Sequence, residues 1–202
     1  MKIIPSLMAL GVLLSPFTNK SQAETEPGQT APDFTLNDSK GNPQKLSAYA
    51  GKFVVLEWMN PECPFVKKHY SGGNMQALQK EYTSRGVIWL SIISSAPGKQ
   101  GYCTGPQAEA YTKDQKASPT AVLLDPSGDV GQKYGAKTTP HMFVINPEGK
   151  IIYMGAIDSI RSTNSADCTK AENYVRQALD AALAGKAVPT SETKSYGCSV
   201  KY

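Results

Sequence analysis

The sequence predicts an α/β domain in which a central mixed β-sheet is flanked by helices. Short runs of β-forming residues alternate along the chain with helical patterns, and this alternation is typical of a largely parallel sheet covered on both faces. The last two β-forming runs are joined by the turn segment 146–150, Asn-Pro-Glu-Gly-Lys, which predicts an antiparallel hairpin at the end of the sheet. A chain of 202 residues is long enough to bury a sizeable core in one domain.

Each element follows from local signals in the sequence. Strands are expected where β-forming residues cluster, and helices where apolar positions recur at helical spacing between capping and stop residues. The expected strands cover residues 34–36, 53–58, 87–93, 121–124, 142–145 and 151–154. The expected helices begin at residue 64, at residue 74, near residue 107 and near residue 168, the last one ending near residue 184. Residues 94–106, rich in glycine and proline, are expected to form a long loop.

The first 23 residues differ from the rest and predict a secretory signal peptide. Lys2 provides a basic start, residues 3–14 are mostly apolar, and small residues at 21 and 23 suit a signal peptidase that cleaves after Ala23. The apolar run is too short for a permanent membrane span. We therefore expect a signal peptide over residues 1–23, a folded domain over 24–185 and a flexible C-terminal tail over 186–202.

The composition narrows the function classes. The net charge is +4, and it falls to +2 when Lys2 and Lys20 leave with the signal peptide, which is too little to indicate a nucleic-acid partner. The densest basic cluster, residues 67–69, is expected to be a solvated helix face. The chain has two histidines, which leaves few ligands for a zinc site. No metal and no cofactor are expected. The mature protein is expected to be periplasmic or otherwise exported, without a membrane anchor; the alternative is an N-terminus that remains attached as an anchor.

Cys63 lies where a buried strand turns into a helix, within the segment 60–64. Pro64 is of the type favoured at the first helical position, which predicts Cys63 as the residue that caps the helix. The unpaired N–H groups and the positive end of the helix dipole at such a place stabilise a thiolate. We therefore expect a lowered pKa and raised nucleophilicity at Cys63. The alternative is a small buried cysteine that only fills space, and the position between two prolines favours the reactive role.

Three segments together resemble the thioredoxin superfamily, and in particular its peroxiredoxin-like branch of redoxin or AhpC/TSA-type proteins. They are residues 31–36, 58–70 and 138–145, with the ending Gly-Cys-Ser-Val-Lys-Tyr at 197–202. The resemblance spans about residues 28–184 and implies a thioredoxin-like fold. It also implies a cis peptide bond between Thr139 and Pro140 that packs against Cys63 and, with Pro64, holds an incoming substrate. The implied partners are protein or small-molecule thiols and disulfides, or peroxides.

Two departures from the family patterns narrow the chemistry. Thioredoxins carry a second cysteine three residues after the first, and Val66 stands in that place, which excludes a local CxxC disulfide. Typical peroxiredoxins place a threonine and a proline at set distances before the reactive cysteine. Here Pro61 is two residues before Cys63, and no matching threonine is present. General thiol redox chemistry is therefore favoured over peroxide reduction.

The four cysteines allow three full pairings, and the sequence alone does not choose among them. Cys198 lies in the tail after Gly197, and a mobile tail would bring it onto Cys63 as a resolving thiol. The alternative is that Cys198 is structural or unreactive. We pair Cys103 with Cys168 as a structural disulfide by elimination, and the alternative is that one of these two resolves Cys63.

The leading hypothesis is a thiol-disulfide oxidoreductase or thiol-dependent peroxidase of the cell envelope. The alternative is a non-catalytic periplasmic binding module or copper chaperone, in which Cys63, His141 and a tail cysteine hold Cu(I). Glu57 is a charged residue in an otherwise apolar strand. It is expected either to relay a proton to a thiol or to face solvent at the end of the strand.

Overall fold

The structure is a computed structural model that describes residues 25–202. The predicted signal peptide lies outside the described residues. The main sheet has seven strands in the order β2-β1-β5-β4-β3-β7-β8, and β6 and β9 form a separate pair. The strands of the main sheet are β1 (Thr35–Asp38), β2 (Pro43–Lys45), β3 (Val54–Trp58), β4 (Ile88–Ile93), β5 (Ala121–Leu124), β7 (His141–Ile145) and β8 (Ile151–Gly155). The small pair consists of β6 (Thr138–Thr139) and β9 (Cys198–Ser199).

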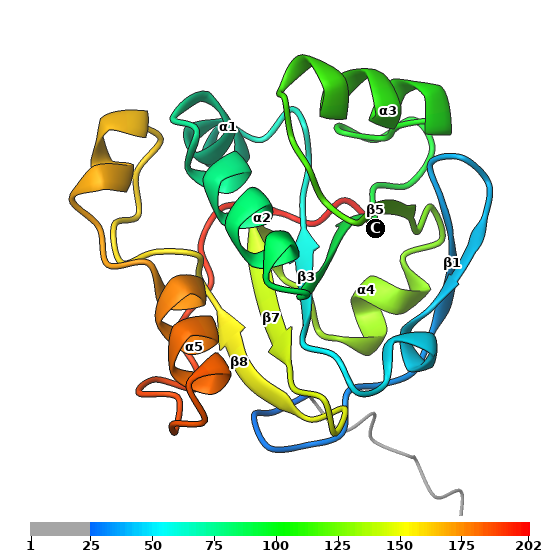
Figure 1. Cartoon of the computed structure of the whole chain (residues 1–202). Helices are drawn as coiled ribbons and strands as arrows, with labels where there is room; N and C mark the ends of the chain where they lie inside the picture. Colours follow the sequence, from blue (N-terminus) through cyan, green and yellow to red (C-terminus); the bar gives the residue numbers. More distant parts are fainter. Residues whose placement is uncertain (1–24) are drawn as a thin grey trace, which may run out of the picture.

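Helices connect and cover these strands (Figure 1). The α-helices are α1 (Pro64–Ser71), α2 (Asn74–Ser84), α3 (Gly105–Asp114), α4 (Asp129–Lys133) and α5 (Tyr174–Leu183). Short 3-10 helices are η1 (Leu46–Tyr49) and η2 (Ser165–Thr169). The result is the predicted α/β architecture, a mixed sheet with helices on both faces.

The sheet topology brings two distant segments to the same edge. The central strands are parallel, since β4 pairs in parallel with both β3 and β5. Both flanks are antiparallel, with β1 on β5 and the predicted β7–β8 hairpin on β3. Trp58 at the end of β3 is therefore opposite His141 at the start of β7. The turn that follows β3 and the loop that precedes β7 must meet at this edge.

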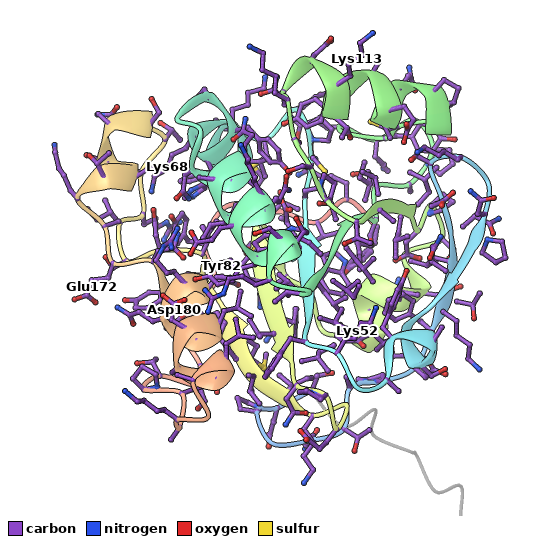
Figure 2. All side chains as sticks on the ribbon, viewed as in Figure 1. Lys52, Lys68, Tyr82, Lys113, Glu172 and Asp180 are labelled. Atoms are coloured by element: carbon purple, nitrogen blue, oxygen red, sulfur yellow. The ribbon has the colours of Figure 1, made fainter. Side chains whose placement is uncertain are left out.

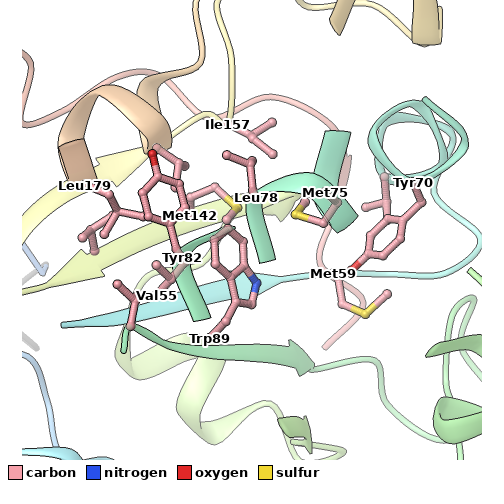
Figure 3. Close-up of a cluster of buried hydrophobic side chains, with 14 of the residues drawn as sticks. Val55, Met59, Tyr70, Met75, Leu78, Tyr82, Trp89, Met142, Ile157 and Leu179 are labelled. Carbon is pink, nitrogen blue, oxygen red and sulfur yellow. The ribbon is translucent and has the colours of Figure 1, made fainter. Parts of the chain in front are cut away.

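The two faces of the sheet carry separate apolar cores, because successive residues of a strand point to opposite faces. One core lies under α1, α2 and α5, and Figure 3 shows part of it around Trp89, Leu78 and Met142. The other lies under η1 and α4. In this second core the rings of Trp58, Tyr134 and Phe143 pack with centroids 5.2 to 5.4 Å apart.

Several predicted boundaries are corrected. The last helix does not begin near Cys168, which lies in η2; it begins at Tyr174. The physical reason is the cap, since the Asn173 side chain accepts a hydrogen bond from Arg176 N at 2.9 Å and starts a new helix there. The sequence showed no clear helical or strand pattern for the short helix α4 or for the strand β2, which follows the predicted turn near residue 41.

The C-terminal tail is docked on the domain, which corrects the expectation of a flexible segment. It runs behind α2 in Figure 1 and ends near β5. Thr138 pairs with Ser199 and Thr139 with Cys198 in antiparallel register. Across residues 25–202, no helix combines the length and the apolar character that crossing a membrane requires.

Candidate active site

Cys63 caps the first helix, as predicted. Its backbone is extended, with φ −69° and ψ 124°, and Pro64 occupies the first helical position. Lys67 N donates a hydrogen bond to Cys63 O at 2.9 Å, which closes the first helical turn. The sulfur therefore lies at the positive end of α1, beside N–H groups that have no partner within the helix.

Asn60 holds the turn between β3 and Cys63. Its Oδ1 accepts a hydrogen bond from Glu62 N at 2.8 Å, and its Nδ2 donates one to Gln100 O at 3.1 Å. The loop can approach this closely because Gly101 has no side chain: a Cβ at this position would lie 2.2 Å from the Asn60 amide. The loop at residues 94–104 is thus joined to the cysteine turn.

The loop before β7 meets Cys63 as the topology requires. The peptide bond between Thr139 and Pro140 is cis, as the family resemblance implied. Cys63 Sγ lies 3.1 Å from Thr139 O, and the thiol donates a hydrogen bond to that carbonyl. Two of the residues predicted to bind substrate, Thr139 and Pro140, thus lie in the loop beside Cys63, and the third, Pro64, follows it directly in the chain.

Cys198 lies against Cys63 in the docked tail. The two sulfur atoms are 2.8 Å apart and are not bonded. The backbone of the tail reaches this place through Gly197, whose φ is +141° and where a Cβ would stand 1.9 Å from Thr139 O. Only a glycine allows this approach. The segment Gly197–Cys198 therefore packs directly against the loop that contains Thr139 and Pro140, hereafter the proline loop.

The two thiols have opposite electrostatic surroundings. Burial raises the pKa of Cys63, but hydrogen bonds from the Cys198 thiol and from the backbone N–H groups of Val66 and Cys198 outweigh it, and the pKa lies below its ordinary value. Burial and the neighbouring Cys63 raise the pKa of Cys198 to about 11. When one proton leaves the pair, the charge therefore resides on Cys63 and Cys198 remains a thiol.

Cys63 is completely buried, with 0 % of its surface exposed, whereas Cys198 is partly exposed. The cover is polar on one side, since it consists of the proline loop and the tail with its thiol. A large substrate reaches Cys63 only when the tail moves away.

The predicted disulfide between Cys103 and Cys168 is not formed, and both carry free thiols. Cys168 Sγ faces α1, 3.8 Å from Lys68 O and 3.7 Å from His69 Nδ1. Cys103 Sγ instead faces Gly101 O at 3.6 Å, in the loop before α3. The predicted pair does not form because the two sulfur atoms lie against different parts of the domain, Cys168 beside α1 and Cys103 in the loop before α3.

The predicted solvated face at residues 67–69 is also corrected, since Lys68 and His69 are buried. Lys68 Nζ donates hydrogen bonds to Asp158 Oδ2 at 2.8 Å and to Ile160 O at 2.6 Å. Figure 2 shows Lys68 between α1 and η2. Its buried charge is stable because a buried carboxylate 90 residues further along the chain balances it.

His69, Asp158 and Cys168 bring possible metal-ligand atoms within 4.8 Å of one another. The ammonium of Lys68 already balances Asp158 and would repel a cation. The predicted copper set of Cys63, His141 and a tail cysteine does not assemble within residues 25–202. His141 does not join the two cysteines, because its ring packs against Phe143, with centroids 4.7 Å apart, and Phe143 belongs to the other core.

Glu57 is buried on the sheet face that α1 and α2 cover, so the expectation that it faces solvent is wrong. Oε1 accepts a hydrogen bond from Tyr70 OH at 2.8 Å. Oε2 accepts from Trp89 Nε1 and Ser91 Oγ, both at 2.8 Å, and from Gln79 Nε2 at 3.2 Å. Burial raises the pKa of this carboxyl, although these four donors act in the opposite direction.

The fold and the cysteine beside a cis-proline loop define a protein of the thioredoxin-like class. The model of the AhpC/TSA family matches residues 27–154. The chain belongs to this family.

Similar proteins agree with this assignment. A relative named thiol-disulfide oxidoreductase ResA, from Bacillus subtilis, is 27% identical over 146 residues, which cover 72% of this chain and 76% of the relative. An uncharacterized conserved protein from Geobacillus kaustophilus has a similar structure, with a TM-score of 0.77, 26% identity, and coverage of 89% of this chain and 94% of the other. A hypothetical protein from Sinorhizobium meliloti has a TM-score of 0.72, 28% identity, and coverage of 89% and 96%.

Proposed function

We propose that this protein is an exported thiol-disulfide oxidoreductase in which Cys63 is the nucleophile and Cys198 the resolving thiol. The observation that carries the proposal is the 2.8 Å separation of the two sulfur atoms at the start of a helix. Export is supported by the signal-peptide pattern of residues 1–23. Relatives named as thiol-disulfide oxidoreductases support the reaction class.

The reaction begins when the tail moves aside and the Cys63 thiolate attacks one sulfur of a partner disulfide. The partner's S–S bond breaks, its second sulfur leaves as a thiolate, and a mixed disulfide joins Cys63 to the partner. Cys198 then loses its proton to the departing sulfur and attacks Cys63. The Cys63–Cys198 disulfide forms, the partner leaves with both sulfurs reduced, and the enzyme is oxidised by two electrons.

The substrates are expected to be protein or small-molecule disulfides. The backbone around Thr139 and Pro140, which the tail occupies in the resting structure, is the proposed place where a partner is held, with Pro64 at the helix start. The same thiolate is the proposed site of peroxide reduction. A glutathione-coupled assay that follows the consumption of hydrogen peroxide tests this activity.

The proposal is tested by following the alkylation rate of Cys63 against pH, with mass mapping of the peptide that contains it. In the reduced protein we expect a titration midpoint below the value of about 8.5 that a free thiol shows. Cys198→Ala removes a hydrogen bond to the thiolate, so its midpoint is expected to be higher. Titration midpoints near 8.5 in both proteins would show that Cys63 is not an activated nucleophile.

A further inference from the structure

The two neighbouring cysteines differ in their access to solvent. Cys63 is fully buried behind the proline loop and the tail, whereas Cys198 is partly exposed on the tail itself. On the same side, Lys201 lies near enough to Cys198 to favour its charged form, and its Nζ donates a hydrogen bond to Ser199 Oγ at 3.0 Å in an exposed position. An incoming thiolate therefore meets Cys198, beside a positive charge, before it meets Cys63.

The tail is held on the N-terminal side of Cys198 by a buried anchor of three residues, Tyr196, Asp158 and Lys68. Tyr196 is 7% exposed, and its hydroxyl donates to Asp158 Oδ1 and accepts from Lys68 Nζ at 3.1 Å. Lys68 also binds Asp158 Oδ2 at 2.8 Å. Because Lys68 belongs to the helix that Cys63 caps, this anchor ties the tail directly to the nucleophile's helix.

A second contact holds the tail on the C-terminal side of Cys198. Tyr202 OH donates a hydrogen bond to Ala136 O at 2.6 Å, and Lys201 O accepts one from Ala96 N at 2.8 Å. The Tyr202 ring lies so close to Gly131 that a Cβ there would stand 2.6 Å from it. Exposing Cys63 requires these contacts to open, whereas reaching Cys198 does not.

We infer that external thiols reduce the Cys63–Cys198 disulfide by attacking the sulfur of Cys198, while the tail stays docked and Cys63 departs as the buried thiolate. This rests on the proposed function, which supplies the disulfide. In the first step, an external thiolate forms a bond to Cys198, and the Cys63–Cys198 bond breaks with its electron pair left on Cys63. A second external thiolate attacks the external sulfur of this mixed disulfide and releases Cys198, which takes up a proton.

The direction of cleavage follows from the environments of the two sulfurs. A disulfide opens fastest when the sulfur that leaves is the better-stabilised thiolate. The N–H of Val66 and the end of the helix stabilise the charge on Cys63. The reductants that fit are therefore small thiols, or thiols on exposed segments that reach Cys198 without displacing the tail.

The test locates the first mixed disulfide. The full mature chain carrying Cys103→Ser and Cys168→Ser is oxidised with glutathione disulfide, freed of excess reagent, and mixed briefly with limiting reduced glutathione. After acid quenching and alkylation, peptic mapping by mass spectrometry shows which cysteine holds glutathione. We expect the adduct on Cys198, at least about tenfold over Cys63. An adduct mainly on Cys63 would overturn the inference, whereas absence of the Cys63–Cys198 disulfide before mixing would instead refute the proposed function.

Tyr196→Phe tests the role of the anchor as a positioning device. It keeps the ring that packs against Phe65 but removes the hydroxyl between Asp158 and Lys68. The loss of hydrogen bonds to charged groups is expected to increase the fraction of adduct on Cys63 about tenfold, and to speed tryptic cleavage after Lys194. The exposed Tyr102→Phe is the matched control, expected to behave as wild type. An unchanged adduct ratio in Tyr196→Phe would show that the anchor does not keep Cys63 covered.

Discussion

Gly197 lies at the contact between the tail and the proline loop, and its replacement by alanine tests how the tail sets the cysteine pair. A Cβ at this position would stand 1.9 Å from Thr139 O and 2.7 Å from Thr139 C. Both atoms belong to backbone that is held by β6–β9 pairing, so neither can rotate away as a side chain would. The residue also has φ +141°, a conformation that favours glycine.

The expected effect of Gly197→Ala follows from this overlap. The tail must move by about 1 Å before the new contact reaches the 3.0 Å that real Cβ atoms tolerate, and crowding of this kind typically costs about 1–3 kcal/mol. The same displacement separates two sulfur atoms that now lie 2.8 Å apart. We therefore expect the equilibrium constant for the Cys63–Cys198 disulfide to fall by roughly ten- to a hundredfold.

The assay is equilibration in glutathione buffers of graded redox ratio, followed by acid quenching and quantification of the disulfide by mass. Gly185→Ala is the matched control, because Gly185 also has a positive φ, +68°, but nothing lies within 4 Å of its added Cβ. It should lose some thermal stability and keep the wild-type disulfide equilibrium. If Gly197→Ala also keeps that equilibrium, the docked tail does not control the pairing of the two sulfurs.

Two further predictions concern buried titratable groups. Because burial raises the pKa of Glu57 from 4.5, the folded protein keeps a proton that the unfolded chain has lost, and the free energy of unfolding falls as the pH rises through the native pKa. Glu57→Gln removes this titration, so its free energy of unfolding, measured with urea from pH 4.5 upward, is expected to fall less as the pH rises. An equally steep fall in the variant would contradict the buried placement of Glu57. Burial, with a contribution from Lys137, lowers the pKa of His141 from 6.5 to about 4, so this group makes the fold lose about 3 kcal/mol as the pH falls from 6.5 to 4. His141→Asn keeps an acceptor for the Lys137 N–H and should remove most of that loss; equal acid sensitivity in urea unfolding would refute it.

Much of the fold was predictable because its signals are local. Runs of β-forming residues marked the central strands, and Pro64 marked the helix start that makes Cys63 a cap. These features depend on the backbone preferences of a few consecutive residues. Similarity of whole segments to a known family added the cis bond before Pro140, which no single Thr-Pro pair predicts.

The buried polar residues were predicted less well, because their environment depends on distant partners. Lys68 has the sequence context of a solvated residue, and it is buried because Asp158 folds against it from 90 positions away. Glu57 is satisfied by donors from β4, α1 and α2. A local pattern gives the face on which such a side chain lies and leaves its partners undefined.

Local patterning was thus sufficient for the architecture and for placing one cysteine at a helix start. The sequence named Cys198 as one candidate partner of Cys63 and left the others open. Tertiary packing decided that Cys198 lies beside Cys63 and that Cys63 is covered when the tail is docked. Cys198 is 135 residues from Cys63 along the chain, and contacts of that separation arise from the docking of whole segments. Three residues produce this docking: the Tyr196 hydroxyl binds the buried Lys68–Asp158 ion pair, Gly197 has no side chain where the proline loop approaches, and the Tyr202 ring lies against Gly131. Each of these contacts forms only when the rest of the domain has folded.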